Sequence, residues 1–229
     1  MSPADWVALI LFLVVWLGYE PILRRVAKRS GAIATDMTVV RGIWMRAMAG
    51  RRDTRLLDSQ LLGHVITSAS FFTSSNLILL AGVAGALFGG RTVFSKAADV
   101  GMAAASLPLL QAKLALVLAV LARGILNFIW AIRQMNYCLA LIGAAPERDA
   151  DPELLRAYAD AASEVLNPAL SSFSQGVRGY YFAMSAAAWL FGPLVFAVGT
   201  LAAFTLLVYR QSRSRSARAV RRMRALLEE

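Results

Sequence analysis

A stripe of polar and aromatic side chains lies on one face of a predicted helix in the third apolar segment of the chain. It consists of Arg123, Asn127, Trp130, Gln134 and Tyr137, and helical periodicity places all of them within a sector of about 80°. A charge at the centre of a bilayer costs at least ~2.5–3.5 kcal/mol, so Arg123 needs water or protein around it. If the stripe lines a pore or cavity, Arg123 attracts anions. If it lies between helices, Arg123 binds backbone carbonyls or a carboxylate, and Asn127 and Gln134 connect neighbouring spans.

Motifs that support catalysis or cofactor binding are absent from the sequence. It has no phosphate-binding glycine loop, no HExxH pair, no GxSxG elbow and no paired catalytic carboxylates. The only histidine, His64, cannot form a metal site alone, and the only cysteine, Cys138, is expected to be a small apolar packing residue. The sequence therefore predicts neither an enzyme nor a metal or cofactor site.

The composition places the chain in a membrane. Of its 229 residues, 58% are apolar and only 17% are charged, and the mean hydropathy is +0.57. A soluble domain carries about a quarter charged residues, so a soluble enzyme and a disordered chain are both excluded. The net charge of +10 is concentrated in blocks beside the apolar runs, which is typical of loops that flank a membrane rather than of a nucleic-acid-binding surface.

Long apolar segments predict four transmembrane helices, since about 20 residues are enough to cross a bilayer. The segments are residues 3–23, 65–90, 108–142 and 179–209. Pro193 lies inside the last segment and predicts a kink there. We expect an all-α polytopic membrane bundle of about four spans with additional interfacial helices, forming one domain over residues 1–210, followed by a basic tail at 211–229.

Two of the intervening polar stretches also have helical character. Residues 33–48 carry apolar side chains at helical spacing, which predicts either an amphipathic helix lying in the membrane interface or a short soluble helix packed on the spans. Asp151, Pro152 and Glu153 are typical of a helix start. Asn167 and Pro168 predict the end of that helix.

Small residues recur at helical spacing in two of the apolar segments and predict close helix packing, within the chain or with another chain. They are Ala81, Gly85 and Gly89 in the second segment, and Ser185, Gly192 and Gly199 in the fourth.

The orientation in the membrane is not decided by four spans. The first span passes from Asp5 to the basic cluster that begins at Arg24, which predicts an external N-terminus. Four spans then place the arginine-rich tail outside, and the numbers of Lys and Arg on the two sides become nearly equal. Either the tail is external, or one segment re-enters without crossing, or the orientation is reversed.

Several ordered motifs resemble the membrane protein family known as domain of unknown function 599. They are Arg41–Arg46, Gln60–His64 followed by Ser68–Ser75, Asn127–Tyr137, and Arg178–Ala183 followed by Trp189 and Tyr209–Arg210. The resemblance covers roughly residues 5 to 215, although the chain has Gly63 and His64 where the family pattern favours Arg and Asn. It implies a multi-pass protein of the inner membrane without assigned activity. It also draws attention to Arg133 and Arg178 as interfacial residues that bind lipid headgroups or simply extend toward water.

These features predict an oligomeric channel or transporter for small anionic solutes. Because four spans leave little room for a pathway in one subunit, the pore is expected on a symmetry axis. The alternative is a structural or regulatory subunit of a larger membrane complex. The expected partners are anionic lipid headgroups and either a second copy of the chain or another membrane protein, and nucleic acid is not expected.

Overall fold

The fold is all-α, as predicted. The computed structural model describes residues 1–51, 55–89, 92, 95 and 106–228, and no strand occurs among them. The helices are α1 (Pro3–Ser30), α2 (Ile33–Ala49), α3 (Arg55–Phe88), α5 (Leu107–Gly143), α6 (Pro152–Ala188), α7 (Pro193–Ser212) and α8 (Arg215–Glu228), with a short 3₁₀ turn, η1 (Trp189–Phe191), between α6 and α7. Residue 90, the expected end of the second span, lies outside the described residues.

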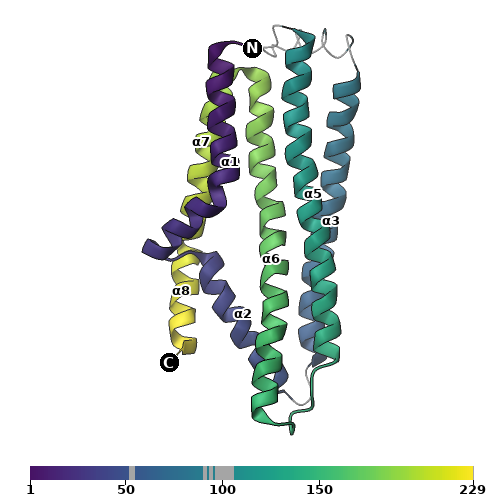
Figure 1. Cartoon of the computed structure of the whole chain (residues 1–229), viewed down its shortest axis with the longest axis vertical. Helices are drawn as coiled ribbons and strands as arrows, with labels where there is room; N and C mark the ends of the chain where they lie inside the picture. The colour runs from purple at the N-terminus through teal and green to yellow at the C-terminus, as the bar shows by residue number, and fades with distance from the viewer. Residues whose placement is uncertain (52–54, 90–91, 93–94, 96–105, 229) are drawn as a thin grey trace.

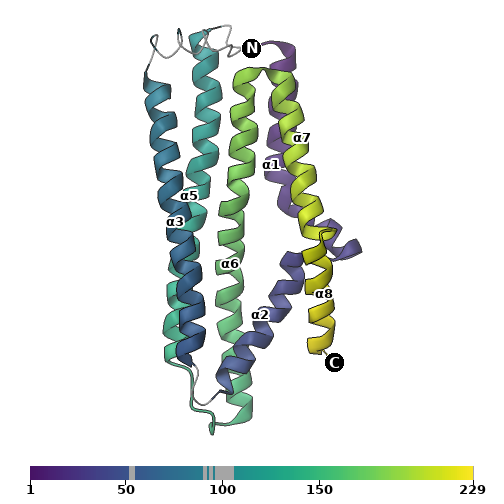
Figure 2. The same ribbon diagram turned by 180° about the vertical axis from the view of Figure 1, so that it is seen from behind.

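The molecule is elongated and has two halves along its length (Figure 1). Helices α3, α5 and α6 run through both halves, whereas α1 and α7 accompany them only in one and α2 and α8 only in the other, and the reverse view agrees (Figure 2). We call these the apolar half and the polar half. At about 1.5 Å per residue, the 37 residues of α5 extend roughly 55 Å, well beyond a hydrocarbon core of about 30 Å.

Each half has its own hydrophobic core. In the apolar half, rings from α1, α6 and α7 pack together, with Phe12 lying 5.1 Å from Phe196 and 6.2 Å from Phe182 between ring centroids. In the polar half, Met45 and Met48 of α2 are buried with Met135 of α5 and other apolar side chains of α3 and α6. Helix α2, predicted over 33–48, is therefore packed on the other helices along this face.

Within the described part of the chain, four stretches are long and apolar enough to cross a membrane, which supports a membrane protein. They are Pro3–Leu23, Arg55–Phe88, Leu107–Gly143 and Pro193–Glu228. The first three correspond to the predicted spans at 3–23, 65–90 and 108–142.

The fourth predicted span, 179–209, is not one kinked helix. Helix α6 ends at Ala188, the chain turns through η1, and α7 returns antiparallel to α6 (Figures 1 and 2). Gly192 has φ 123°, a conformation that only glycine adopts readily, and Pro193 occupies the first turn of α7. An uncharged run of this length fits one long helix or two helices joined by a tight turn, and hydropathy does not separate them.

The hairpin also changes the role of the predicted small-residue seam. Ser185 and Gly199 face each other across the two helices, and the Ser185 hydroxyl donates a hydrogen bond to the Gly199 carbonyl at 3.1 Å. Gly192 instead forms the turn. The seam therefore joins α6 to α7 rather than forming one face of a single helix.

Helix α6 begins as predicted but does not end where Asn167 and Pro168 suggested. Pro152 occupies its first turn, and the Asp151 carboxylate accepts from the Glu153 backbone N–H. The helix then continues through Pro168 to Ala188. Leu166 and Ala169, on either side of Pro168, are fully buried in the core of the polar half, and this packing compensates for the hydrogen bond that Pro168 cannot make.

Candidate functional site

A partly buried ion pair joins α6 to α1 where the two halves of the molecule meet. A guanidinium nitrogen of Arg178 donates to a carboxylate oxygen of Glu20. The guanidinium also lies 5.3 Å from the centroid of the Tyr19 ring, a cation–π distance. Arg178 is only 8% exposed, so Glu20 provides the charge compensation that a buried arginine requires.

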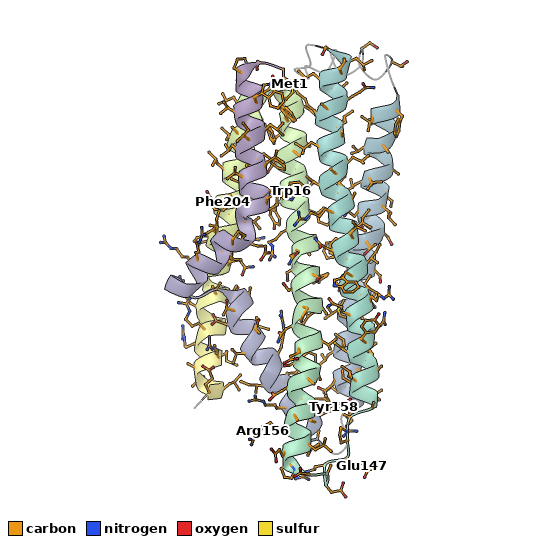
Figure 3. All side chains as sticks on the ribbon, viewed as in Figure 1. Met1, Trp16, Glu147, Arg156, Tyr158 and Phe204 are labelled. Carbon is orange, nitrogen blue, oxygen red and sulfur yellow. The ribbon has the colours of Figure 1, made fainter. Side chains whose placement is uncertain are left out.

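Arg123 approaches the same region from α5. Its guanidinium carbon lies 5.2 Å from the ring centroid of Trp16, and Figure 3 shows Trp16 on the side of α1 that is turned toward α6. The carbonyl or carboxylate partner that was expected for a position between helices is not found for Arg123 among the described residues; an aromatic face provides the contact.

Close contact between α5 and α6 places these arginines next to each other. The Cβ position that a side chain at Gly176 would occupy lies 2.6 Å from the Phe128 ring, and that of Gly179 lies 3.6 Å from the Gly124 Cα atom. A Cβ atom at Gly176 would collide with the Phe128 ring, whereas one at Gly179 would make an ordinary contact. The close approach of α5 and α6 brings Arg123 and Arg178 to one cavity.

The first cavity, the α1–α5–α6 cavity, has a volume of about 40 Å³. Its polar lining consists of Glu20, Arg123, Asn127, Gln175 and Arg178. This volume holds water molecules rather than a polyatomic solute.

The second cavity, the α2–α6 cavity, has a volume of about 120 Å³ and shares Glu20 and Arg178 with the first. The side chains that line it come from α1, α2, α6 and α7, and they are Glu20, Leu23, Ile33, Ala34, Met37, Thr38, Arg41, Asn167, Ser171, Ser174, Arg178 and Gln211. The ion pair therefore lies between two adjoining spaces.

Three polar atoms of the α2–α6 cavity are buried but unpaired. They are Arg41 Nε, Asn167 Oδ1 and Gln211 Oε1, none of which has a hydrogen-bond partner within the described part of the chain. Burial also lowers the pKa of the Arg41 guanidinium from its ordinary value. Since buried polar groups are almost always hydrogen-bonded, these atoms indicate that water or a ligand occupies the cavity.

The predicted stripe on α5 divides between two environments. Arg123 and Asn127 line the α1–α5–α6 cavity. Trp130 and Tyr137 are 52% and 47% exposed on the outside of the molecule. Gln134 is half-buried, and its Oε1 has no partner among the residues that the structure describes.

The remaining predicted site residues lie apart from the cavities. Arg133 is exposed and donates from Nε to the Tyr137 hydroxyl at 2.7 Å, whereas Arg178 is buried. Ala81 and Gly85 of α3 and Gly89, directly after its end, are exposed. A Cβ atom at Gly85 would meet nothing within 4 Å in the described structure.

Arg41, Asn167 and Gln211 were not among the predicted site residues. On α6, the cavity residues Asn167, Ser171, Ser174 and Arg178 recur at helical spacing, and this polar stripe was the available signal. It lies in a stretch whose sequence favours two separate elements, a helix that ends at Asn167 and Pro168 and a span that begins at residue 179. No comparable pattern marks Gln211, which reaches the cavity because α7 folds back.

Comparison with known proteins leaves the activity open. No curated protein and no solved structure matches the chain. No cluster of His, Cys, Asp and Glu side chains suited to a metal ion occurs among the described residues. The family described as "Protein of unknown function, DUF599" matches residues 7–216, nearly the whole chain, and the protein belongs to this family.

Proposed function

We propose that this chain is a channel or transporter for small anionic solutes in the inner membrane, with no catalytic activity. The observation that supports this proposal is the pair of adjoining cavities that share the Glu20–Arg178 ion pair. Arg123 lines one cavity and Arg41 the other. Guanidinium groups in a space of low dielectric attract anions much more strongly than they do in water.

The ion pair is the natural barrier of such a pathway. The α1–α5–α6 cavity is too small for a polyatomic anion as it stands. An anion that binds Arg178 competes with Glu20 for the same guanidinium, and loss of that contact joins the two spaces. The proposed pathway runs within one subunit, so it does not require the symmetry axis that the sequence suggested.

We further propose that the C-terminal half of α6 is a fifth crossing. It lies alongside α1, α5 and α7 at the same level of the molecule (Figures 1 and 2), and the Gly192 turn connects it to α7. Five crossings with an external N-terminus place the basic loop after α1 and the arginine-rich tail on the same, internal side. This distribution satisfies the positive-inside rule, which four spans did not.

Cysteine labelling in intact cells tests the number of crossings. In a background with Cys138→Ala, we expect Ser2→Cys to react with an impermeant maleimide and Ser214→Cys to react only after the membrane is opened. Equal labelling of both positions in intact cells contradicts five crossings.

Flux measurements in liposomes test the transport proposal. Purified protein is expected to release entrapped small anions, with the rate lowered about tenfold or more by Arg123→Gln, because this change removes a charge that lines the α1–α5–α6 cavity and leaves the ion pair intact, and a charge-assisted contact is worth roughly 1.5–3 kcal/mol. Arg156→Gln, at an exposed position on α6, is the matched control and should leave the rate unchanged. If vesicles with and without protein release anions equally, the chain is not an anion pathway.

One observation favours the second candidate, a structural or regulatory subunit. The face of α3 that carries Gly85 is exposed and open, and small residues in a membrane allow another helix to approach closely. This function predicts that the chain purifies in a fixed ratio with another membrane protein in mild detergent. Purification of the chain alone, at wild-type stability, argues against it.

A further inference from the structure

The α2–α6 cavity contains more hydrogen-bonding capacity than its own side chains use. Arg41 Nε is a donor, whereas Asn167 Oδ1 and Gln211 Oε1 are acceptors, and all three are buried without a partner in the described residues. A ligand that satisfies them must accept one hydrogen bond and donate two. A simple anion such as chloride leaves both acceptors unpaired.

The charge of the α2–α6 cavity limits the kinds of ligand that can bind there. The charged side chains that line it are Glu20, Arg41 and Arg178. Glu20 and Arg178 neutralise each other, and Arg41 has no ion-pair partner among the described residues. The cavity therefore carries one uncompensated positive charge, which favours a ligand with a single negative charge and neutral hydrogen-bond donors.

The position of the cavity brings it to the level of lipid headgroups. Its lining includes Leu23, the last residue of the first apolar span, and Ile33 and Met37 at the start of α2. A ligand here contacts apolar side chains on one side and polar ones on the other. This amphipathic lining is suited to the junction of a headgroup and its acyl chains.

We infer that the α2–α6 cavity binds a glycerol phosphate group. The phosphate lies at Arg41, within reach of Arg178, and the two glycerol hydroxyls donate to Asn167 Oδ1 and Gln211 Oε1. The inference rests on the proposed function for its membrane setting, and it names the ligand of the same cavity. The headgroup of phosphatidylglycerol presents this chemistry with a single negative charge, and soluble glycerol 3-phosphate presents the same phosphate and hydroxyl groups with a charge of about −1.5 to −2 at pH 7.

Four lipids separate the contributions of charge and hydroxyl groups. Protein in detergent is titrated with phosphatidylglycerol, phosphatidylethanol, phosphatidylethanolamine and phosphatidylcholine, and bound lipid is counted by native mass spectrometry. Phosphatidylethanol keeps the negative charge but has no headgroup hydroxyl, so we expect it to bind about tenfold more weakly than phosphatidylglycerol. The two zwitterionic lipids should bind more weakly still. Equal binding of phosphatidylglycerol and phosphatidylethanol overturns the inference.

Calorimetric titration with glycerol 3-phosphate and ethyl phosphate distinguishes the two sources of the ligand. Binding of glycerol 3-phosphate in preference to ethyl phosphate identifies a soluble solute. If phosphatidylglycerol binds selectively and glycerol 3-phosphate does not bind, the ligand is the lipid. If no glycerol phosphate compound binds, only water fills the cavity and the inference is wrong.

Substitutions of the cavity residues test which side chain binds the phosphate and which ones bind the glycerol hydroxyls. Asn167→Leu and Gln211→Leu should each weaken phosphatidylglycerol binding toward that of phosphatidylethanol and leave phosphatidylethanol binding unchanged. Arg41→Gln should weaken both, whereas the exposed control Arg156→Gln should weaken neither. Because Asn167 also donates to the Thr38 carbonyl, Gln211→Leu on α7 provides the same measurement if Asn167→Leu does not fold. Unchanged lipid preference in all cavity variants contradicts the assignment.

The binding and flux measurements can contradict the two proposals independently of each other. Selective glycerol phosphate binding without anion flux overturns transport and leaves the site. Anion flux without glycerol phosphate binding overturns the site and leaves transport.

Discussion

The apolar and polar halves of the molecule are stabilised by different interactions. In the apolar half, aromatic rings pack between helices, and Trp189 stacks on Phe196 at 5.0 Å between centroids. In the polar half, ion pairs connect helix surfaces, as between Arg46 of α2 and Asp160 of α6 at 2.9 Å. Lipid provides no hydrophobic driving force between helices, so close packing of shapes and rings, as in the apolar half, is the kind of packing that a membrane requires. In water, an amphipathic face and a charged surface are sufficient.

The cavities lie where these two kinds of packing meet. Helix α6 belongs to both cores, and Arg178 lies on it near the junction with α1. Aromatic rings border the space there, as Tyr19 does beside Arg178, but they do not fill it. The comparison indicates that a change in packing type along one helix leaves room for polar cavities.

The largest expected effect is at Trp189 in the apolar half. This side chain is 1% exposed, and its indole N–H donates to the Asp5 carboxylate at 2.9 Å. Trp189→Ala should lower the free energy of unfolding by about 3–5 kcal/mol, because it leaves a large cavity and removes one of the hydrogen bonds to the Asp5 carboxylate. Trp189→Phe keeps an aromatic ring and should cost less. Thermal unfolding in detergent measures both, and similar losses in the two variants would show that ring packing contributes little.

Substitution of Gly176 and of Gly85 tests the difference between a packed face of α6 and an open face of α3. Gly176→Ala should lower stability by about 1–3 kcal/mol, because its Cβ would lie 2.6 Å from the Phe128 ring. Gly85→Ala should be neutral or raise stability by up to about 1 kcal/mol, since its Cβ meets nothing within 4 Å in the described structure. Unfolding measurements on the monomer decide this, and a loss of association in Gly85→Ala would instead identify α3 as an interface.

The smallest expected effect is a pH dependence in the polar half. Burial raises the pKa of Tyr158, although the positive charge of Arg55 opposes the shift. The neutral phenol donates to the Leu141 carbonyl at 2.7 Å. Because the folded pKa lies above the unfolded value of about 10, this stabilisation is complete below pH 10 and is lost as pH rises through the folded pKa.

Unfolding temperatures at pH 8 and above pH 10 test this sign. Tyr158→Phe should cost about 0.5–1.5 kcal/mol at pH 8, the value of one hydrogen bond, and should lose less stability than the wild type on going to alkaline pH. An identical alkaline loss in both proteins would assign the pH dependence to other groups.

The sequence by itself determined the helical fold, the presence of apolar stretches long enough to cross a membrane, and the position of most helices. Apolar runs of sufficient length and helical periodicity are local properties, and so is the start of α6 at Asp151 and Pro152. The resemblance to DUF599 was likewise readable from ordered motifs, and the family match over residues 7–216 confirms it.

Only the tertiary structure decided how the apolar run at 179–209 is divided, because a helix and a hairpin bury the same uncharged residues. It also decided that Glu20 pairs with Arg178, which lies far away in the sequence. The cavity residues Arg41, Asn167 and Gln211 come from three helices, and no local pattern connects them. Packing of distant segments creates such a site, so its chemistry becomes readable only after the helices are placed side by side.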